Sequence, residues 1–307
     1  MDKTIMSAGG AVITVLAAAG IAAGSFFDME TAQAVHSPDN IFWRIITVMG
    51  MYPYLAVWVF YMGVICRQAR SSGMSEKKKT LWTVVCGYLG LSTSVICSWA
   101  MLSLDTLGWM FPQVIDNPSV IAAVALLVVY PMFFAGYFTS KKEYDNELLK
   151  RLVRLCVIML IPVLMMSVLK LIFCRPRYRL LICEIPGIEF HRWYVPFVGS
   201  VSFINDMGVS WNDFRSFPSG HAVMSMGLVF ALPPLAEIYD RLYGRKLLLF
   251  GAGAVFAILV CISRMVLGAH FLSDVCAGSL IAVLFLFVEL RADKASRKKV
   301  TEQSKFI

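Results

Sequence analysis

Eight long apolar runs dominate the sequence and limit what the chain can fold into. Each has about the twenty residues that an α-helix needs to cross the hydrocarbon core of a bilayer. Within lipid every backbone N–H and C=O group needs a partner inside the protein, so such runs fold as helices. The chain is therefore predicted to be an all-α, polytopic membrane helix bundle. The runs cover residues 6–27, 42–66, 80–104, 119–139, 152–173, 220–238, 247–267 and 270–290.

The composition agrees with this fold class. Hydrophobic residues make up 58% of the 307 residues and charged residues 16%, which is too apolar for a soluble domain. The net charge of +8 lies mostly in short loops between apolar runs, where it orients a membrane protein, so it predicts no nucleic-acid partner. No protein partner is predicted either. No repeat or linker divides the sequence, and we expect one membrane domain over residues 1–307.

The distribution of lysine and arginine among the loops predicts the orientation in the membrane. Cytoplasmic loops collect these residues. Here they follow the second, fourth, sixth and eighth runs, whereas segments 28–41 and 105–118 contain none. Both termini are therefore predicted to be cytoplasmic, in a membrane such as the bacterial cytoplasmic membrane. The charges on which this prediction rests are Arg67, Arg70, Lys77, Lys78, Lys79, Lys141, Lys142, Lys150, Arg151, Arg154, Arg241, Arg245, Lys246, Arg291, Lys294, Arg297, Lys298, Lys299 and Lys305.

One outward segment departs from this pattern. The segment 174–219 is the longest loop, and it is rich in arginine on the side that otherwise lacks it. Arginine binds phosphate and carboxylate groups through paired hydrogen bonds, so an anionic ligand is the predicted reason. Cys174 and Cys183 border the same loop and could form a disulfide in an oxidising compartment. The arginines are Arg175, Arg177, Arg179, Arg192 and Arg215.

The first group of candidate functional residues lies where the fifth run meets this loop. Lys170 stands inside the apolar run, where a charged side chain is costly unless water or an anion meets it. Arg175 and Arg177 follow it within the next turns of the chain. Taken alone, these residues are explained equally well by an anion site and by side chains that reach out to lipid headgroups.

The second group is Ser-Phe-Pro-Ser-Gly-His, residues 216–221, immediately before the sixth run. Gly220 allows a tight turn into a helix whose first N–H groups have no partner within the helix, and such an end binds anions. His221 stands beside this end and can donate a proton to a leaving group. The structural alternative is that Ser219 is an ordinary helix cap and His221 an interfacial residue.

The third group lies between the seventh and eighth runs, in the stretch Ser-Arg-Met-Val-Leu-Gly-Ala-His-Phe-Leu-Ser-Asp over residues 263–274. Polar residues of this kind within membrane helices usually have a function. His270 and Asp274 are four residues apart and share a face if this run is helical, so the carboxylate can orient the imidazole. Gly268 and Ala269 are expected to break the chain, so that Arg264 ends one helix and His270 starts the next.

All three groups fall on the outward face, which was assigned without using them. Several cations beside a helix N-terminus suit a phosphate dianion. Two histidines, one of them backed by a carboxylate, suit a double displacement in which one imidazole attacks phosphorus and the other protonates the departing oxygen. The sequence contains no compact carboxylate or cysteine cluster that would bind a metal, so we expect metal-independent chemistry without a cofactor.

At these residues the chain resembles the type 2 phosphatidic acid phosphatase (PAP2) family of membrane phosphatases, which is related to the vanadium haloperoxidases. The family has three motifs: Lys, six residues and Arg-Pro; Pro-Ser-Gly-His; and Ser-Arg, five residues, His, three residues and Asp. The first is matched at Lys170 and Arg177, with Tyr178 in place of proline. The second is matched by residues 218–221, and the third by Ser263, Arg264, His270 and Asp274.

The resemblance covers about residues 150–290. It implies that His270 is the nucleophile that forms a phosphohistidine and that Asp274 orients it. His221 would be the general acid and then the base that activates water. The same resemblance makes residues 80–139 an inserted helical hairpin on the N-terminal side of a PAP2-like core. The phosphate-binding residues it implies are Lys170, Arg177, Ser219, Gly220 and Arg264, with Arg175 as the alternative to Arg177.

The predicted function is hydrolysis of a lipid phosphate or lipid pyrophosphate at the extracytoplasmic face of the bilayer. Two alternatives remain: transfer of the phosphoryl group to another lipid through the same intermediate, and a non-enzymatic anion or lipid transporter. Isoprenoid pyrophosphate, phosphatidylglycerophosphate, phosphatidate and lipid A are all candidate substrates.

Overall fold

The computed structural model describes residues 2–140, 143–196, 204, 206 and 208–303, with side chains described up to residue 294. Lys141, Lys142 and Lys305, which contributed to the predicted orientation, lie outside the described residues. The side chains of Arg297, Lys298 and Lys299 lie outside the described part as well. The described chain is helical, without β-strands.

Eight helical segments of the described residues are long and apolar enough to cross a membrane, which confirms the all-α, multi-pass fold class. Most of their ends lie within a few residues of the predicted runs, because the length of an apolar run fixes the length of the helix that hides its backbone from lipid. The segments are Asp2–Val35, Ile41–Ser71, Glu76–Met101, Pro118–Thr139, Asn146–Leu181, Gly220–Ile238, Lys246–Val266 and Leu272–Lys294.

Several of these segments are interrupted and contain more than one helix. The α-helices are α1 (Asp2–Val35), α2 (Ile41–Met49), α3 (Tyr52–Ser71), α4 (Glu76–Met101), α5 (Pro118–Val124), α6 (Pro131–Thr139), α7 (Asn146–Phe173), α8 (Tyr178–Leu181), α10 (Gly220–Ala231), α11 (Leu235–Ile238), α12 (Lys246–Val266) and α13 (Leu272–Gln303). A π-helical turn, Ala125–Val129, joins α5 to the α6 segment. The short 3₁₀ turns are Leu107–Trp109, Pro112–Val114, Trp211–Phe214 and Asp240–Leu242.

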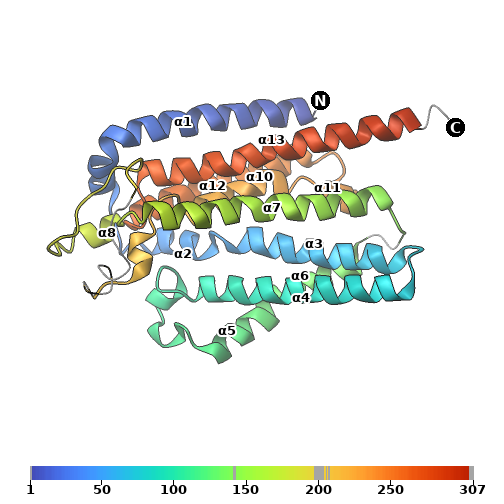
Figure 1. Ribbon diagram of the computed structural model, residues 1–307, viewed down its shortest axis with the longest axis horizontal. Helices are drawn as coiled ribbons and strands as arrows, with labels where there is room; N and C mark the ends of the chain where they lie inside the picture. Colours follow the sequence, from blue (N-terminus) through green and yellow to red (C-terminus); the bar gives the residue numbers. More distant parts are fainter. Residues whose placement is uncertain (1, 141–142, 197–203, 205, 207, 304–307) are drawn as a thin grey trace.

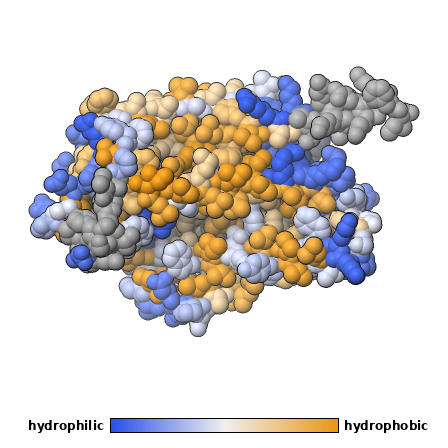
Figure 2. Space-filling model, in the orientation of Figure 1, coloured by the Kyte–Doolittle hydropathy of each residue, from blue (hydrophilic) through white to orange (hydrophobic). Residues whose placement is uncertain are grey.

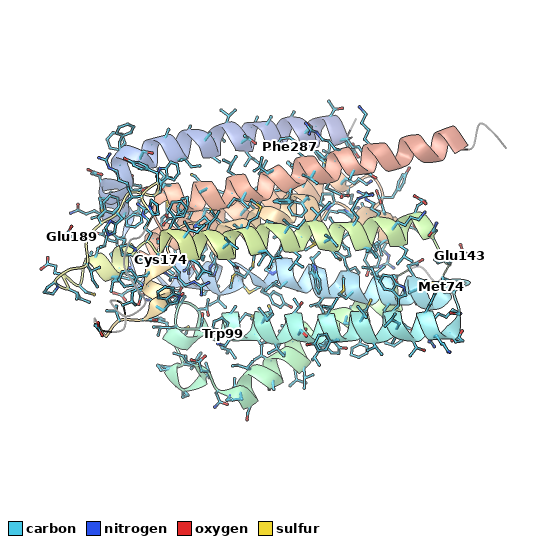
Figure 3. The ribbon with its side chains drawn as sticks, viewed as in Figure 1. Met74, Trp99, Glu143, Cys174, Glu189 and Phe287 are labelled. Carbon is cyan, nitrogen blue, oxygen red and sulfur yellow. The ribbon has the colours of Figure 1, made fainter. Side chains whose placement is uncertain are left out.

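The long helices lie side by side along one axis, and the chain reverses direction at each end of the bundle (Figure 1). Both termini lie at the same end of the bundle, and α8 lies at the other (Figure 1). Met74 and Glu143, in loops between spans, lie at the end that carries the termini, whereas Cys174 and Glu189 lie at the opposite end (Figure 3). On the face shown in Figure 2, apolar surface covers the middle of the bundle and hydrophilic residues gather at its two ends. This is the surface expected of a bundle that crosses a bilayer.

Helix α10 forms the centre of the bundle. All of its residues from Gly220 to Ala231 are buried, and it packs against α3, α7, α12 and α13. Its sequence, Gly-His-Ala-Val-Met-Ser-Met-Gly-Leu-Val-Phe-Ala, has small residues among the larger ones and no charged residue, so neighbouring helices can approach it closely. Because α10 begins at Gly220, the second candidate group lies at the N-terminal end of this buried helix.

Helices α4 to α6, the residues predicted to form an inserted hairpin, lie together along one side of the bundle (Figure 1). They join the rest of the protein through α3, which packs against both α4 and α6. The backbones of α3 and α6 meet at two glycines: a Cβ atom added to Gly63 would collide with the carbonyl oxygen of Phe133, and one added to Gly136 with that of Phe60. This contact requires glycine, as helix contacts within membranes often do.

Gly63→Ala is therefore expected to lower the thermal unfolding midpoint of the full-length protein in detergent. The added methyl group forces α3 and α6 apart, and overpacking of this kind costs about 1–3 kcal/mol. Gly251→Ala is the matched control, because Gly251 also lies inside a helix but has nothing within 4 Å of an added Cβ atom. Equal midpoints for the two variants would contradict the close approach of α3 and α6.

Candidate active site

The chain reverses direction between α12 and α13, where the third candidate group lies. Helix α12 ends at Val266, and Gly268 has a left-handed backbone with φ of 64°. The amide of His270 then donates to the carbonyl of Arg264 at 3.2 Å, which closes the end of the helix. Helix α13 begins at Leu272. Arg264 thus lies in the last turn of α12, and His270 lies just before α13, with the break at the predicted place.

His270 is held as a neutral imidazole. Its side chain is buried, and Nδ1 lies 2.6 Å from the carbonyl oxygen of Ser216. A carbonyl oxygen can only accept, so Nδ1 carries the proton and Nε2 keeps its lone pair. Burial, together with the nearby cations of Lys170 and Arg264, lowers the pKa of His270 to about 3 although Asp274 opposes the shift. A neutral imidazole with a free Nε2 is the form that can attack phosphorus.

Asp274 reaches His270 through Ser216 rather than directly. Its Oδ2 atom is 3.8 Å from Nδ1 of His270, which is too long for a hydrogen bond. Oδ2 instead accepts from the hydroxyl of Ser216 at 2.5 Å and from the amide of Phe271 at 2.8 Å. Since the carbonyl of Ser216 binds Nδ1 of His270, the carboxylate orients the residue that orients the imidazole. The carboxylate and the imidazole thus lie near each other, and the hydrogen-bonded link between them runs through Ser216.

Arg175 lies behind Asp274, away from the other arginines. Its Nη1 donates to Asp274 at 2.6 Å, its Nη2 to Asp28 at 2.9 Å, and its Nε to a backbone carbonyl of the 174–219 loop at 2.7 Å. The guanidinium also lies 4.2 Å from the ring centroid of Phe271. All three nitrogens thus bind protein acceptors. Arg175 is one of the phosphate-binding residues expected from the sequence, but these contacts make it a support for Asp274.

Asp28 is a second residue of this network that the sequence analysis did not select. It lies in α1 and is only 2% exposed, and its carboxylate also accepts from the amide and hydroxyl of Ser273 at 3.0 and 2.5 Å. In the sequence it directly follows the first apolar run, a position that does not distinguish it from a loop residue. Helix α1 continues to Val35, however, and this brings Asp28 inside the bundle.

We expect Asp28→Ala to destabilise the protein by about 3–5 kcal/mol, because it removes one partner of a buried ion pair. The loss would appear as a lower thermal unfolding midpoint in detergent. Glu30→Ala is the control, since Glu30 lies on the same helix but is exposed. If both variants unfold at the wild-type temperature, Asp28 does not support the Arg175–Asp274 pair.

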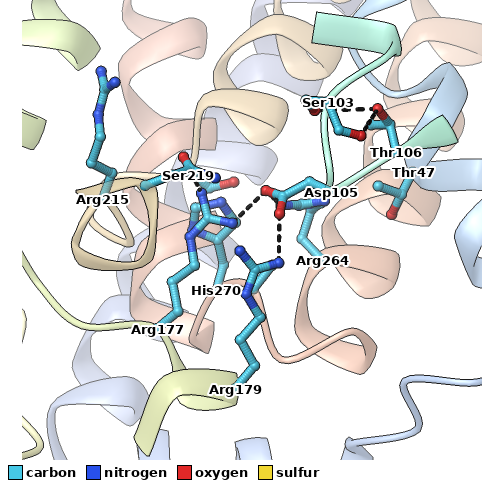
Figure 4. A network of polar contacts seen from close by, with 12 residues as sticks. Thr47, Ser103, Asp105, Thr106, Arg177, Arg179, Arg215, Ser219, Arg264 and His270 are labelled. Atoms are coloured by element: carbon cyan, nitrogen blue, oxygen red, sulfur yellow. Dashed lines mark hydrogen bonds and ion pairs between the residues drawn. The ribbon is translucent and has the colours of Figure 1, made fainter. Parts of the chain in front are cut away.

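Arg177 and Arg264 meet at the other side of His270. Arg177 lies at the start of α8 and Arg264 at the end of α12, and both side chains are buried. Arg177, Arg179 and Arg264 point toward the carboxylate of Asp105, whereas Arg215 points away (Figure 4). Asp105 comes from the connection between α4 and α5, and the sequence analysis did not select it either. Although burial opposes the shift, the guanidinium groups of Arg177, Arg179 and Arg264 hold the pKa of Asp105 well below its usual range.

The remaining candidates surround this cluster. Ser219 is the N-cap of α10, and its hydroxyl accepts from the amide of Ala222 at 3.4 Å. Lys170 lies beside the start of α10, because its Cε atom is 3.8 Å from where a Cβ atom on Gly220 would be. The Nζ atom of Lys170 donates to the carbonyl of Arg215. His221 is close enough to Arg264 and His270 to interact with them electrostatically. The structure thus brings the sequence candidates together at one end of the bundle, with Arg175 set behind them.

Several buried nitrogen atoms of this cluster have no hydrogen-bond partner among the described residues. They are Nε and Nη1 of Arg264, Nε of Arg177 and Nε2 of His221. Buried polar atoms without partners are rare in folded proteins, and a group of them around one point indicates a missing ligand. Because the arginine atoms only donate, that ligand must supply acceptors, as an anion with several oxygens does.

Within the described residues, this arrangement includes neither a metal-binding cluster nor a disulfide. The described residues contain no group of three or more His, Cys, Asp or Glu side chains placed to hold a metal ion. Metal independence itself stays a prediction. Cys174 and Cys183 are separate thiols, which donate to the carbonyls of Leu171 and Arg179 at 3.2 and 3.4 Å.

Comparison with known proteins assigns this part of the chain to a family. The family model of the PAP2 superfamily matches residues 151–298. The chain belongs to the PAP2 superfamily. This family is of the phosphatase type, and the eight membrane-length helices fit it. The PAP2 match includes every residue of the site described above except Asp28 and Asp105. No curated protein and no solved structure matches the chain.

Proposed function

We propose that this PAP2 protein is an integral-membrane phosphatase that hydrolyses a lipid phosphate or lipid pyrophosphate through a phosphohistidine. The observation that carries the proposal is the group of buried, unpartnered donors on Arg177 and Arg264, with the unpartnered Nε2 of His221, beside the neutral imidazole of His270. A phosphoryl group has the acceptor oxygens that the arginine donors lack. His270 supplies a nucleophile for its phosphorus.

The proposed reaction has two steps. In the first, Nε2 of His270 forms a bond to phosphorus while the bond from phosphorus to the leaving oxygen breaks, and His221 gives that oxygen a proton. In the second, His221 takes a proton from water, the water oxygen attacks phosphorus, and the bond to Nε2 breaks to release phosphate. Arg177, Arg264 and Lys170 offset the charge on the phosphoryl oxygens in both steps. The proton on Nδ1 of His270 stays on Nδ1 throughout, donated to the carbonyl of Ser216.

The place of the site within the bundle supports a lipid substrate. Lys170 and Arg264 lie in the last turns of α7 and α12, and Ser219 lies at the start of α10. These helix ends belong to membrane-length segments, so the cluster lies at the depth where lipid headgroups meet the hydrocarbon core. A phosphate at that depth can remain attached to a hydrophobic chain that stays within the bilayer.

Replacement of the two histidines should separate the two steps. His270→Ala is expected to abolish release of inorganic phosphate from a panel of lipid phosphates in the presence of a chelator, because no nucleophile remains. His221→Ala should slow release about 10²–10⁴-fold, as loss of a general acid or base does, and should leave phosphohistidine to accumulate with p-nitrophenyl phosphate, whose leaving group needs no proton.

Tyr243→Ala, whose side chain is 86% exposed, is the control and should keep wild-type activity. Undiminished phosphate release by His270→Ala would contradict the mechanism. Radiolabel that appears in a second lipid instead of in free phosphate would favour phosphoryl transfer. Binding of lipid phosphate without any phosphohistidine or turnover would favour the non-enzymatic transporter.

We also propose that the active site faces the extracytoplasmic side and that both termini are cytoplasmic. Apart from the arginine-rich 174–219 loop beside the site, the lysine- and arginine-rich loops lie at the end of the bundle that carries the termini, and such loops stay in the cytoplasm. A bacterial cytoplasmic membrane is the proposed location.

Cys183 provides a native probe of this orientation. Its thiol is exposed and follows α8 at the site end of the bundle. A membrane-impermeant maleimide is expected to label the wild-type protein on intact cells, and Cys183→Ser should remove most of the label because the other described cysteines are buried or half-buried in the bundle. Labelling that appears only after the membrane is permeabilised would reverse the proposed orientation.

A further inference from the structure

Asp105 occupies the cationic centre of the proposed phosphate site. Its Oδ2 atom accepts from Nη1 of Arg177 and from Nη2 of Arg264, the latter at 3.1 Å. Its Oδ1 atom accepts from Nη1 of Arg179 at 2.5 Å. The carboxylate is only 6% exposed. Both arginines to which we assign the substrate phosphate therefore already hold an anion that belongs to the protein.

A carboxylate and a phosphoryl group use the same donors of arginine, because each offers oxygens that match the planar guanidinium fork. The Nη atoms of Arg177 and Arg264 that donate to Asp105 are therefore the same atoms that would donate to two phosphoryl oxygens. Both anions bound together would be close like charges in a buried site, where repulsion is strong. Displacement of one by the other is physically favoured over coexistence.

The surrounding contacts allow Asp105 to move away without leaving Arg179 unpaired. Arg179 also binds Asp213, at 2.6 and 2.9 Å, so it keeps a counter-charge when Asp105 withdraws. The donors that are then released are those of Arg177 and Arg264, next to their unpartnered Nε atoms. A phosphoryl group can take all of these donors together.

The segment that carries Asp105 is ordered by its own contacts. The hydroxyl of Thr106 donates to the carbonyl of Ala100 at 2.9 Å, and the amide of Thr106 donates to the carbonyl of Ser103 at 3.0 Å. Farther along, the ring of Trp109 lies under the guanidinium of Arg44, 3.3 Å from ring centroid to carbon. These contacts keep Asp105 near the arginines, and a tethered anion competes at a high effective concentration.

We propose that Asp105 is an internal competitor for the substrate phosphate and thereby determines specificity. It occupies the site when no substrate is bound, and the substrate must displace it. A phosphomonoester or a diphosphate carries more charge than the carboxylate and outcompetes it, whereas a phosphodiester carries the same single charge and does not. This inference rests on the proposed function, since it concerns the same site.

Binding to the purified full-length protein tests the inference without requiring turnover. The probes are inorganic phosphate, at a pH where the dianion predominates, and dimethyl phosphate, a monoanion, both measured by calorimetry. Asp105→Asn keeps the shape of the side chain and removes its charge. We expect it to tighten phosphate binding about tenfold or more, which corresponds to about 1.4 kcal/mol. Dimethyl phosphate should bind measurably to this variant and not to the wild type.

Asp116→Asn is the matched control. Asp116 lies in the same connection between α4 and α5 but binds Trp99, at 2.8 Å, and it should leave both affinities unchanged. If Asp105→Asn binds phosphate no more tightly than the wild type, Asp105 organises the arginines and does not compete with the ligand. Equal tightening by Asp116→Asn would also overturn the inference, because the effect would then be one of general charge.

Hydrogen exchange on the wild-type protein tests the same point without relying on the folding of a variant. Saturating phosphate should speed exchange of amides over residues 102–111, since Asp105 is released, and should slow it around His270. Unchanged or slower exchange over residues 102–111 would mean that Asp105 stays in place. Because both experiments measure binding, absence of phosphatase activity would overturn the proposed function and leave the test of Asp105 intact.

Discussion

A guanidinium group in the interior of a membrane protein must have a counter-charge, because removal of an unpaired ion from water is prohibitively costly. Arg175, Arg177 and Arg264 are all buried at the same end of this bundle, and the protein satisfies them in two ways. The nitrogens of Arg175 all donate to Asp28, Asp274 and a backbone carbonyl, so Arg175 supports the structure of the site and does not bind a ligand. Arg177 and Arg264 share the carboxylate of Asp105 and keep donors unpaired, so their charge is available to a ligand.

Arg175 organises the catalytic side of the site. Asp274, fixed by Arg175, accepts from the hydroxyl of Ser216, and the carbonyl of Ser216 selects the tautomer of His270. The backbone amide of Ser219 donates to the carbonyl of Asp274 at 3.0 Å, which ties the start of α10 to the start of α13. The two proposed catalytic histidines are thus positioned by helix ends that are joined to each other. Small movements of one end would be transmitted to the other.

Much of this organisation could be predicted from sequence, because it depends on local patterns. The length of the apolar runs predicts the spans, and the motif spacings identify Lys170, Arg177, His221, Arg264 and His270, which the structure brings together. The part of Ser216 in orienting His270 could not be predicted from the four-residue spacing, which says only that Asp274 can lie beside His270. Ser216 is 54 residues from His270 and 58 from Asp274 in the sequence, so no local pattern includes it.

The roles of Arg175, Asp28 and Asp105 depend on contacts between distant parts of the chain. Arg175 and Arg177 are two residues apart in a short non-helical segment between α7 and α8, and the direction of each side chain follows from where its carboxylate partner lies. Those partners are in α1 and in the connection between α4 and α5, more than seventy residues away in the sequence. No spacing rule within a motif includes such residues.

The link between Asp28 and Ser273 has a consequence for how the protein is made. Asp28 in α1 and Ser273 in α13 are 245 residues apart in the sequence, and Asp28 gains its full set of partners only when both helices are in the membrane. Arg175 can pair with Asp28 before α13 is made, but the two hydrogen bonds from Ser273 form only after α13 has entered the membrane. Insertion of α13 therefore completes the network around Asp28, and a chain cut short before that helix leaves a buried carboxylate with part of its hydrogen bonds unmade.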